Sequence, residues 1–219
     1  MFNYAAVIKP ILIELDEARA LHQPVRVEAD LIPLFTKHSS FKTIDLYPIP
    51  QGPICGMHLS NAKSGVAQIF YRRCESHFAK DLVASCPECQ LARVTVAKEL
   101  VHVLDSNGAR TSIEAAPDLL IDLLLKGALA ENSHVQADST AVFWAIEMLA
   151  RFQHRLVQLG GPLGSTSALT NAKTTDNWGL YATGYAIPTG VARIAYSDNF
   201  MNLAKTFRDA VGLPTICVI

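Results

Sequence analysis

The pentapeptide Lys98-Glu99-Leu100-Val101-His102 differs at one position from the helical pattern His-Glu-x-x-His. In that pattern two histidines four residues apart share one helical face, so both imidazoles reach the same Zn²⁺. The glutamate between them takes a proton from the metal-bound water. Here Glu99 and His102 keep these residue types, whereas Lys98 stands at the first ligand position. Because a lysine ammonium is a cation at neutral pH, it is a poor zinc ligand.

Apolar periodicity and turn residues predict the elements around this motif. The motif helix is expected over 91–104, where Asp105-Ser106-Asn107-Gly108 ends it. Two β-segments at 55–59 and 66–71 are expected to form a hairpin. A polar loop is expected over 162–178, and further helices are expected over 4–22, 28–37, 117–130, 138–159, 188–195 and 198–211.

Composition limits the classes of function. The 219 residues are 50% hydrophobic and 18% charged, which suits one globular domain over residues 1–219. The net charge of -1 and the lack of a basic cluster argue against a nucleic-acid partner. We identify no signal peptide and no apolar run long enough to span a membrane, so a cytoplasmic location is expected. The five cysteines are then expected to be reduced.

A second motif lies just before the motif helix. Cys74-x-x-His77 and Cys86-x-x-Cys89 have the spacing of a structural zinc site, since each pair can supply one edge of a tetrahedron. These residues fall in a polar stretch at 72–90, which we interpret as a small Cys/His insertion. Two alternatives stay open at this point. The stretch is a polar loop with partly buried thiols, or Cys86 and Cys89 form a redox pair.

The segment Arg93–Leu104 resembles the motif helix of the ImmA/IrrE metallopeptidase family, whose pattern is approximately Arg-Phe-Thr-x-Ala-His-Glu-Leu-Gly-His-x-Leu. The segment Asp138–Leu149 is similar to the later helix of that family, which supplies the third zinc ligand from its leading glutamate. Asp138 falls on the ligand position, and the positions that match in register are Ala141, Ala145, Glu147 and Leu149.

This resemblance implies an α+β fold: a mostly helical, zincin-like domain with a small β-sheet packed on the motif helix. It also implies that Glu99 is the general base of an active member, and that His102 and Asp138 are the two metal ligands left in a degenerate site. Lys98 replaces the first ligand, and its ammonium is expected to pair with Glu99 and Asp138 where the metal would lie.

Three functions remain as alternatives. The first is a catalytically impaired regulatory module whose cleft binds a protein segment, such as a transcriptional repressor, by strand addition to 66–71. The second is an active zinc metallopeptidase that cleaves a regulatory protein, in which Glu147 or His134 joins His102 and Asp138 on the metal. The third is an interaction domain clipped by zinc on Cys74, His77, Cys86 and Cys89. Arg155 is expected to be a surface or capping charge.

Overall fold

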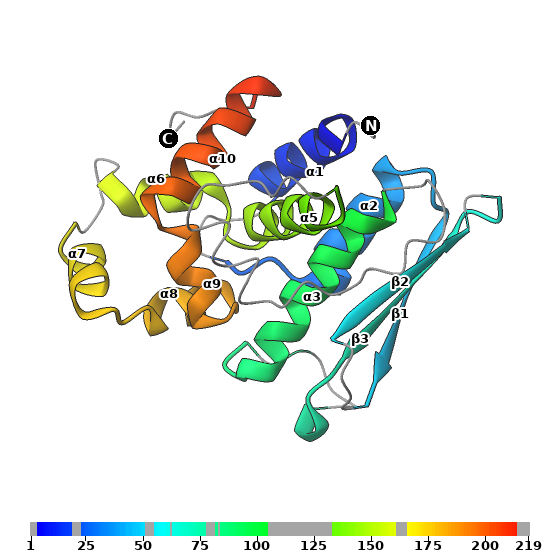
Figure 1. Cartoon of the computed structure of the whole chain (residues 1–219), viewed down its shortest axis with the longest axis horizontal. Coiled ribbons are helices and arrows are strands. Elements are labelled where there is room, and N and C mark those ends of the chain that lie inside the picture. The colour runs from blue at the N-terminus through cyan, green and yellow to red at the C-terminus, as the bar shows by residue number, and fades with distance from the viewer. Residues whose placement is uncertain are drawn as a thin grey trace.

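The chain forms a mixed α+β fold in which helices predominate and the strands build one three-stranded sheet (Figure 1). The structure is a computed structural model that describes residues 4–18, 23–50, 55–61, 63–77, 82, 84–104, 133–160 and 166–213. The helix expected over 117–130 lies outside these residues. The coarse prediction of an α+β, mostly helical fold with a small sheet is confirmed.

The sheet consists of β1 (Thr43–Ile49), β2 (Gly56–Asn61) and β3 (Val66–Arg72), in the order β1-β3-β2. β2 and β3 form the expected antiparallel hairpin, with His58 opposite Ile69. β1, which the sequence pattern did not predict, pairs parallel with β3. β3 is therefore the central strand, and it cannot accept an added peptide strand. This placement corrects the proposed docking at 66–71.

The motif lies on α3 (Pro87–Val103), which begins four residues earlier than expected. The backbone N–H of the first helical residue has no partner inside the helix, so proline, which lacks this N–H, loses no hydrogen bond there. Pro87 therefore suits the start of α3. α3 packs against β2, β3 and α5 (Ser133–Leu149), and most of its side chains are buried. The helix on which the motif lies is thus a central element of the fold, covered by the sheet on one side and by helices on the other.

Gly56 allows the start of β2 to lie directly on α3. A Cβ atom at this position would lie 2.2 Å from Thr95 Cγ2, well inside van der Waals contact. Glycine is therefore the residue that fits this close approach of backbone to helix. The approach places the next inward residues of β2 beside the motif on α3.

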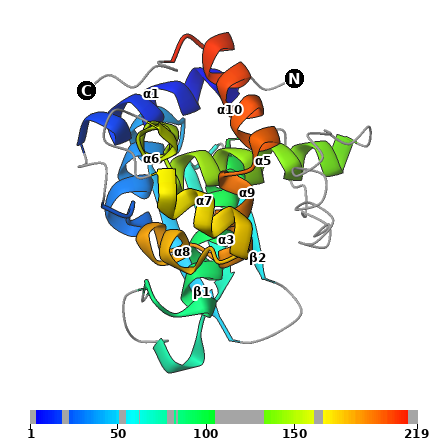
Figure 2. The same ribbon diagram turned by 90° about the vertical axis from the view of Figure 1, so that its left-hand side faces the viewer.

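The other helices surround α3 and α5. Figures 1 and 2 show the later helices on the side of α3 away from the sheet. No described helix is both long and apolar enough to cross a membrane. The bounds are α1 (Tyr4–Ala18), a π-helical segment (Val27–Leu31), α2 (Ile32–His38), α6 (Phe152–Gly160), α7 (Thr166–Thr175), α8 (Gly179–Tyr185), α9 (Thr189–Ala195) and α10 (Asp198–Ala210).

One helix prediction and one loop prediction are wrong. The long helix expected over 138–159 is broken at 150–151 into α5 and α6, and the loop expected over 162–178 contains α7. At the break, the buried Arg151 donates a hydrogen bond to the Leu15 carbonyl of α1, which a continuous helix pattern does not reveal. The helix thus ends where a side chain hydrogen-bonds to distant backbone, although the local apolar periodicity would continue it.

Arg155 lies in the core rather than on the surface. It is 0% exposed and pairs with Glu147, which is also 0% exposed, while its Nη1 donates to the Ala195 carbonyl at 2.5 Å. Arg208 from α10 lies 3.8 Å from the second Glu147 oxygen. The guanidiniums of Arg155 and Arg208 also lie over the ring of Phe152. This network joins α5, α6 and α10. Arg155 is therefore not a surface charge, but its hydrogen bond to the carbonyl of Ala195, the last residue of α9, agrees with the alternative of a capping charge.

Candidate metal centre

The two Cys/His pairs converge at the junction between β3 and α3. The ligand atoms of Cys74, His77, Cys86 and Cys89 all lie within 4.8 Å of one another. The distances are 3.2 Å from Cys74 Sγ to His77 Nδ1, 3.7 Å from Cys74 Sγ to Cys86 Sγ, and 3.6 Å from Cys89 Sγ to His77 Nδ1. Among the described residues, these four form the only group of three or more potential ligands that is so closely spaced.

The Cys74–Cys86 and Cys89–His77 distances match the edges of a zinc tetrahedron, whereas the Cys74–His77 distance is shorter. With Zn–S of about 2.3 Å and Zn–N of about 2.0–2.1 Å, tetrahedral angles require S···S edges of about 3.8 Å and S···N edges of about 3.6 Å. The Cys74–Cys86 separation of 3.7 Å is also far longer than the S–S bond of about 2.05 Å in a disulfide. All four described cysteines are free thiols. The geometry therefore suits a metal ion better than a disulfide.

Local structure explains how each pair is held. Cys74 lies two residues after the end of β3, and the 3-10 turn at Glu75–His77 brings His77 back toward it, with His77 N donating to the Cys74 carbonyl at 3.1 Å. Cys86 is the N-cap residue of α3, and Cys89 lies in the first turn of that helix. One pair thus comes from the end of the sheet and the other from the start of the helix, so an ion would join the two elements.

The thiols of the two pairs have opposite pKa shifts. The backbone N–H of Cys89 donates to the Cys86 sulfur and lowers the pKa of Cys86, an effect that outweighs the opposing effect of burial. Burial raises the pKa of Cys74, as do hydrogen bonds to Glu88 and Cys86. Metal binding needs thiolates, and a dication offsets the cost of a buried thiolate. Cys86 is therefore more readily deprotonated for metal binding than Cys74.

The structure places a separate polar cluster around the α3 motif. Glu99 is 0% exposed, and its Oε2 lies 2.9 Å from His58 Nδ1. Lys98 Nζ lies 3.1 Å from Glu99 Oε1, an ion-pair contact without hydrogen-bond geometry. The rings of His58 and His102 are stacked with centroids 5.6 Å apart. The expected contact between Lys98 and Glu99 is present, and His58 joins them from β2.

His58 is a member of this cluster that the sequence did not reveal. It lies 41 positions from Glu99, on a strand whose register alone brings it to the helix. The nearest sequence signal is Gly56, which marks a close backbone approach two residues earlier.

The other proposed metal ligands of the α3 motif have different outcomes. Glu147 is held by Arg155 within the core, so its proposed role as a replacement ligand is wrong. Asp138 and His134 belong to α5, but their side chains lie outside the described part of the chain. The ligand role of Asp138 therefore stays a prediction.

The Glu99 carboxyl has a pKa below its ordinary value. Burial raises this pKa, but the hydrogen bond from His58 and the charges of Lys98, His102 and His58 together outweigh burial. A carboxyl with a depressed pKa in the folded state stabilises the fold above its unfolded pKa, and this stability is lost as the pH falls.

Replacing Glu99 by Gln should therefore destabilise the protein at pH 7 and change little in acid. As the pH falls below the ordinary glutamate pKa of about 4.3, the stability gap between the two proteins is expected to narrow. Urea unfolding across this range measures the gap, and both proteins share the same Cys/His cluster. A gap that is constant with pH would contradict an ionised Glu99.

Comparison with family models, curated proteins and solved structures finds no match to this chain. The resemblance to the ImmA/IrrE metallopeptidases therefore stays a prediction from the sequence, and the metal-binding geometry of Cys74, His77, Cys86 and Cys89 rests on the structure itself.

Proposed function

We propose that the chain is a zinc-stabilised, non-catalytic binding module. The proposal is carried by one observation: four zinc-type ligand atoms within 4.8 Å of one another. A Cys₃His set is typical of structural zinc, because four protein ligands leave no coordination position for water or substrate. Zinc here fixes the start of α3 to the end of β3, and it thereby holds the motif helix against the sheet.

The α3 motif is proposed to be the remnant of a zincin-like active site. In an active member, Glu99 would face a metal-bound water. Here the carboxylate contacts Lys98 and His58 instead, at 3.1 and 2.9 Å. A carboxylate that is ion-paired with a lysine ammonium is a weaker base, because the positive charge favours its ionised form. The contact between Lys98 and Glu99 supports a structural role for the lysine ammonium, as an internal cation in place of a metal.

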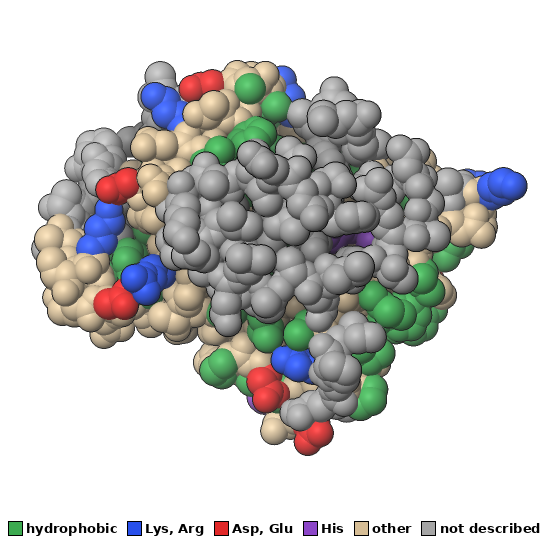
Figure 3. Space-filling model, viewed as in Figure 1, with side chains coloured by type: hydrophobic (Ala, Val, Ile, Leu, Met, Phe, Trp, Pro, Cys, Tyr) green, Lys and Arg blue, Asp and Glu red, His purple; other side chains and the backbone are tan. Residues whose placement is uncertain are grey.

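The proposed partner is a protein segment, such as part of a transcriptional repressor, that adds to the edge of the sheet. Among the described strands, β2 ends the sheet on the side of the motif cluster. Leu59 on this strand is 51% exposed, and Figure 3 shows hydrophobic side chains gathered on the side of the sheet. An extended segment beside His58–Asn61 would gain backbone hydrogen bonds and an apolar contact.

The metal content of the purified protein tests the zinc proposal. We expect one zinc per chain in the wild type and in His102→Ala, and none in Cys86→Ser. Cys55→Ser is the matched control, because Cys55 is a half-buried free thiol that does not belong to the cluster. Loss of zinc from His102→Ala, with retention in Cys86→Ser, would instead place the metal at the α3 motif.

The zincin-like proposal has its own test. Lys98→His restores the missing ligand type of the His-Glu-x-x-His pattern, so a second zinc per chain is expected at the α3 motif if His102 and Asp138 face the same point. Lys98→Gln removes the charge without adding a ligand and serves as the control. A content of one zinc in both variants would count against a zincin-like arrangement.

A further inference from the structure

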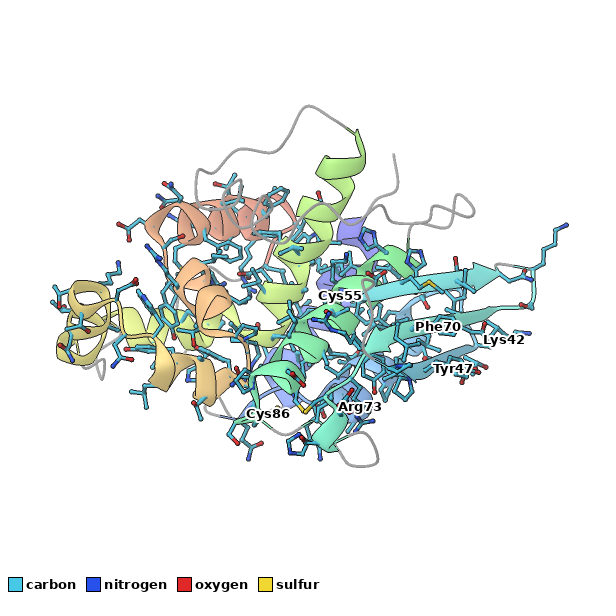
Figure 4. All side chains as sticks on the ribbon, turned by 60° about the horizontal axis from the view of Figure 1, so that its bottom comes forward. Lys42, Tyr47, Cys55, Phe70, Arg73 and Cys86 are labelled. Carbon is cyan, nitrogen blue, oxygen red and sulfur yellow. The ribbon has the colours of Figure 1, made fainter. Side chains whose placement is uncertain are left out.

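A small pocket lies beside the Cys/His cluster, between the first turns of α3 and the end of β3. Its volume is about 150 Å³, and its polar lining includes Cys55, Arg72, Arg73, Glu88 and Thr95. Figure 4 shows Cys55, Arg73 and Cys86 around this end of the sheet, whereas Lys42 lies at the other end. Drug-sized ligands occupy roughly 300–1,000 Å³, so this pocket suits a small ion or the end group of a larger ligand.

The Arg73 guanidinium has donor capacity that the described residues do not use. Its Nε is buried without a hydrogen-bond partner. Its Nη1 makes one long hydrogen bond, of 3.4 Å, to the Tyr71 hydroxyl. A buried charged donor without an acceptor carries a desolvation cost. Arg73 also lines the pocket, so an acceptor that enters the pocket would contact this side chain and offset part of the cost.

The arginines of the lining favour an anion by their geometry. Two arginines and one glutamate line the pocket, and the three thiolates and one Zn²⁺ of the proposed metal site beside it would add one net negative charge. Glu88 is hydrogen-bonded to Cys74, at the edge of the metal cluster. Arginine presents its N–H groups as a planar fork that matches the oxygens of a carboxylate or a phosphate.

We propose that this pocket binds a small oxyanion, a carboxylate or a phosphate group, through the Arg73 guanidinium. Arg72 adds a second positive charge, and Thr95 supplies a hydroxyl from α3. The site is separate from the proposed zinc function, although Cys74 borders both. A bound oxyanion would join β3 to α3 at a second point. The occupancy of this site would depend on the concentration of the anion in solution.

Calorimetric titration of the full chain with inorganic phosphate, and separately with acetate, tests this site. Chloride is used to hold the ionic strength constant. We expect saturable binding of at least one oxyanion, and the better of the two identifies the chemistry as phosphate or carboxylate. Arg73→Lys keeps the charge but loses the planar fork, so at least tenfold weaker binding is expected. Arg73→Gln should abolish binding.

Arg193→Gln is the matched control, because Arg193 is a surface arginine that lies 3.5 Å from Asp176 and does not line the pocket. It should bind the oxyanion as the wild type does. Three results would overturn the proposal: no saturable binding of either anion, unchanged affinity in Arg73→Gln, or loss of zinc from Arg73→Gln. The last result would make Arg73 a counter-charge for the thiolates. If the wild type contains no zinc but still binds the oxyanion, the zinc proposal is contradicted and the oxyanion proposal is not.

Discussion

Chelation of the metal is expected to lower the melting temperature of this protein by roughly 8–16 °C. A ligand at 1,000 times its Kd stabilises the folded state by about 4 kcal/mol. For a chain of this size, each kcal/mol corresponds to about 2–4 °C. The physical reason is that the proposed ion would join Cys74 and His77 at the end of β3 to Cys86 and Cys89 at the start of α3. Thermal unfolding followed by circular dichroism, with and without chelator, measures the shift.

Cys89→Ser and His102→Ala provide the controls for this experiment. Cys89 is 0% exposed and belongs to the cluster. Its serine variant should therefore have a lower melting temperature than the wild type, and the chelator should not change that temperature. His102→Ala should shift with chelator by as much as the wild type does. If a zinc-containing wild type melted at the same temperature before and after chelation, a structural role for the metal would be refuted.

Arg155→Leu is expected to cost about 3–5 kcal/mol of unfolding free energy, because it leaves the buried Glu147 carboxylate without its main partner. The remaining cation, Arg208, lies 3.8 Å from the other carboxylate oxygen, too far for a hydrogen bond. Guanidinium chloride unfolding at neutral pH measures the loss.

A double variant separates lost charge pairing from lost packing. Replacing both Arg155 and Glu147 by Leu removes the unpaired charge, and much of the lost stability should return. Arg193→Leu, on the surface, should change stability by less than about 1 kcal/mol. An Arg155→Leu protein as stable as the wild type would show that Glu147 is neutral in the folded state.

Local patterns predicted the motif helix, the β2–β3 hairpin and the helices near the C-terminus. Each of these depends on nearby residues: apolar spacing, a polar turn, or a stop signal. The Cys/His spacing also predicted a group of side chains that the structure brings together, because both pairs lie close in sequence and each needs only one turn of chain.

Long-range contacts account for what the sequence did not reveal. β1 pairs with β3 although β2 lies between them in the sequence. No pattern in Thr43–Ile49 indicates which strand is its partner. His58 reaches Glu99 only through the sheet register. Arginine is a residue type that is usually exposed, and the burial of Arg155 depends on Glu147 and on α10. Charged residues in a core are identified by their partners, which a single sequence does not show.

The closeness of the four ligands in the chain has a consequence for the order of folding. Because they lie between residues 74 and 89, closing this loop costs little chain entropy. Loops of this size close in well under a microsecond, long before β1 can find its place beside β3. A metal ion can therefore bind while most of the chain is unfolded, fix the first turn of α3 and give the helix a starting point for growth.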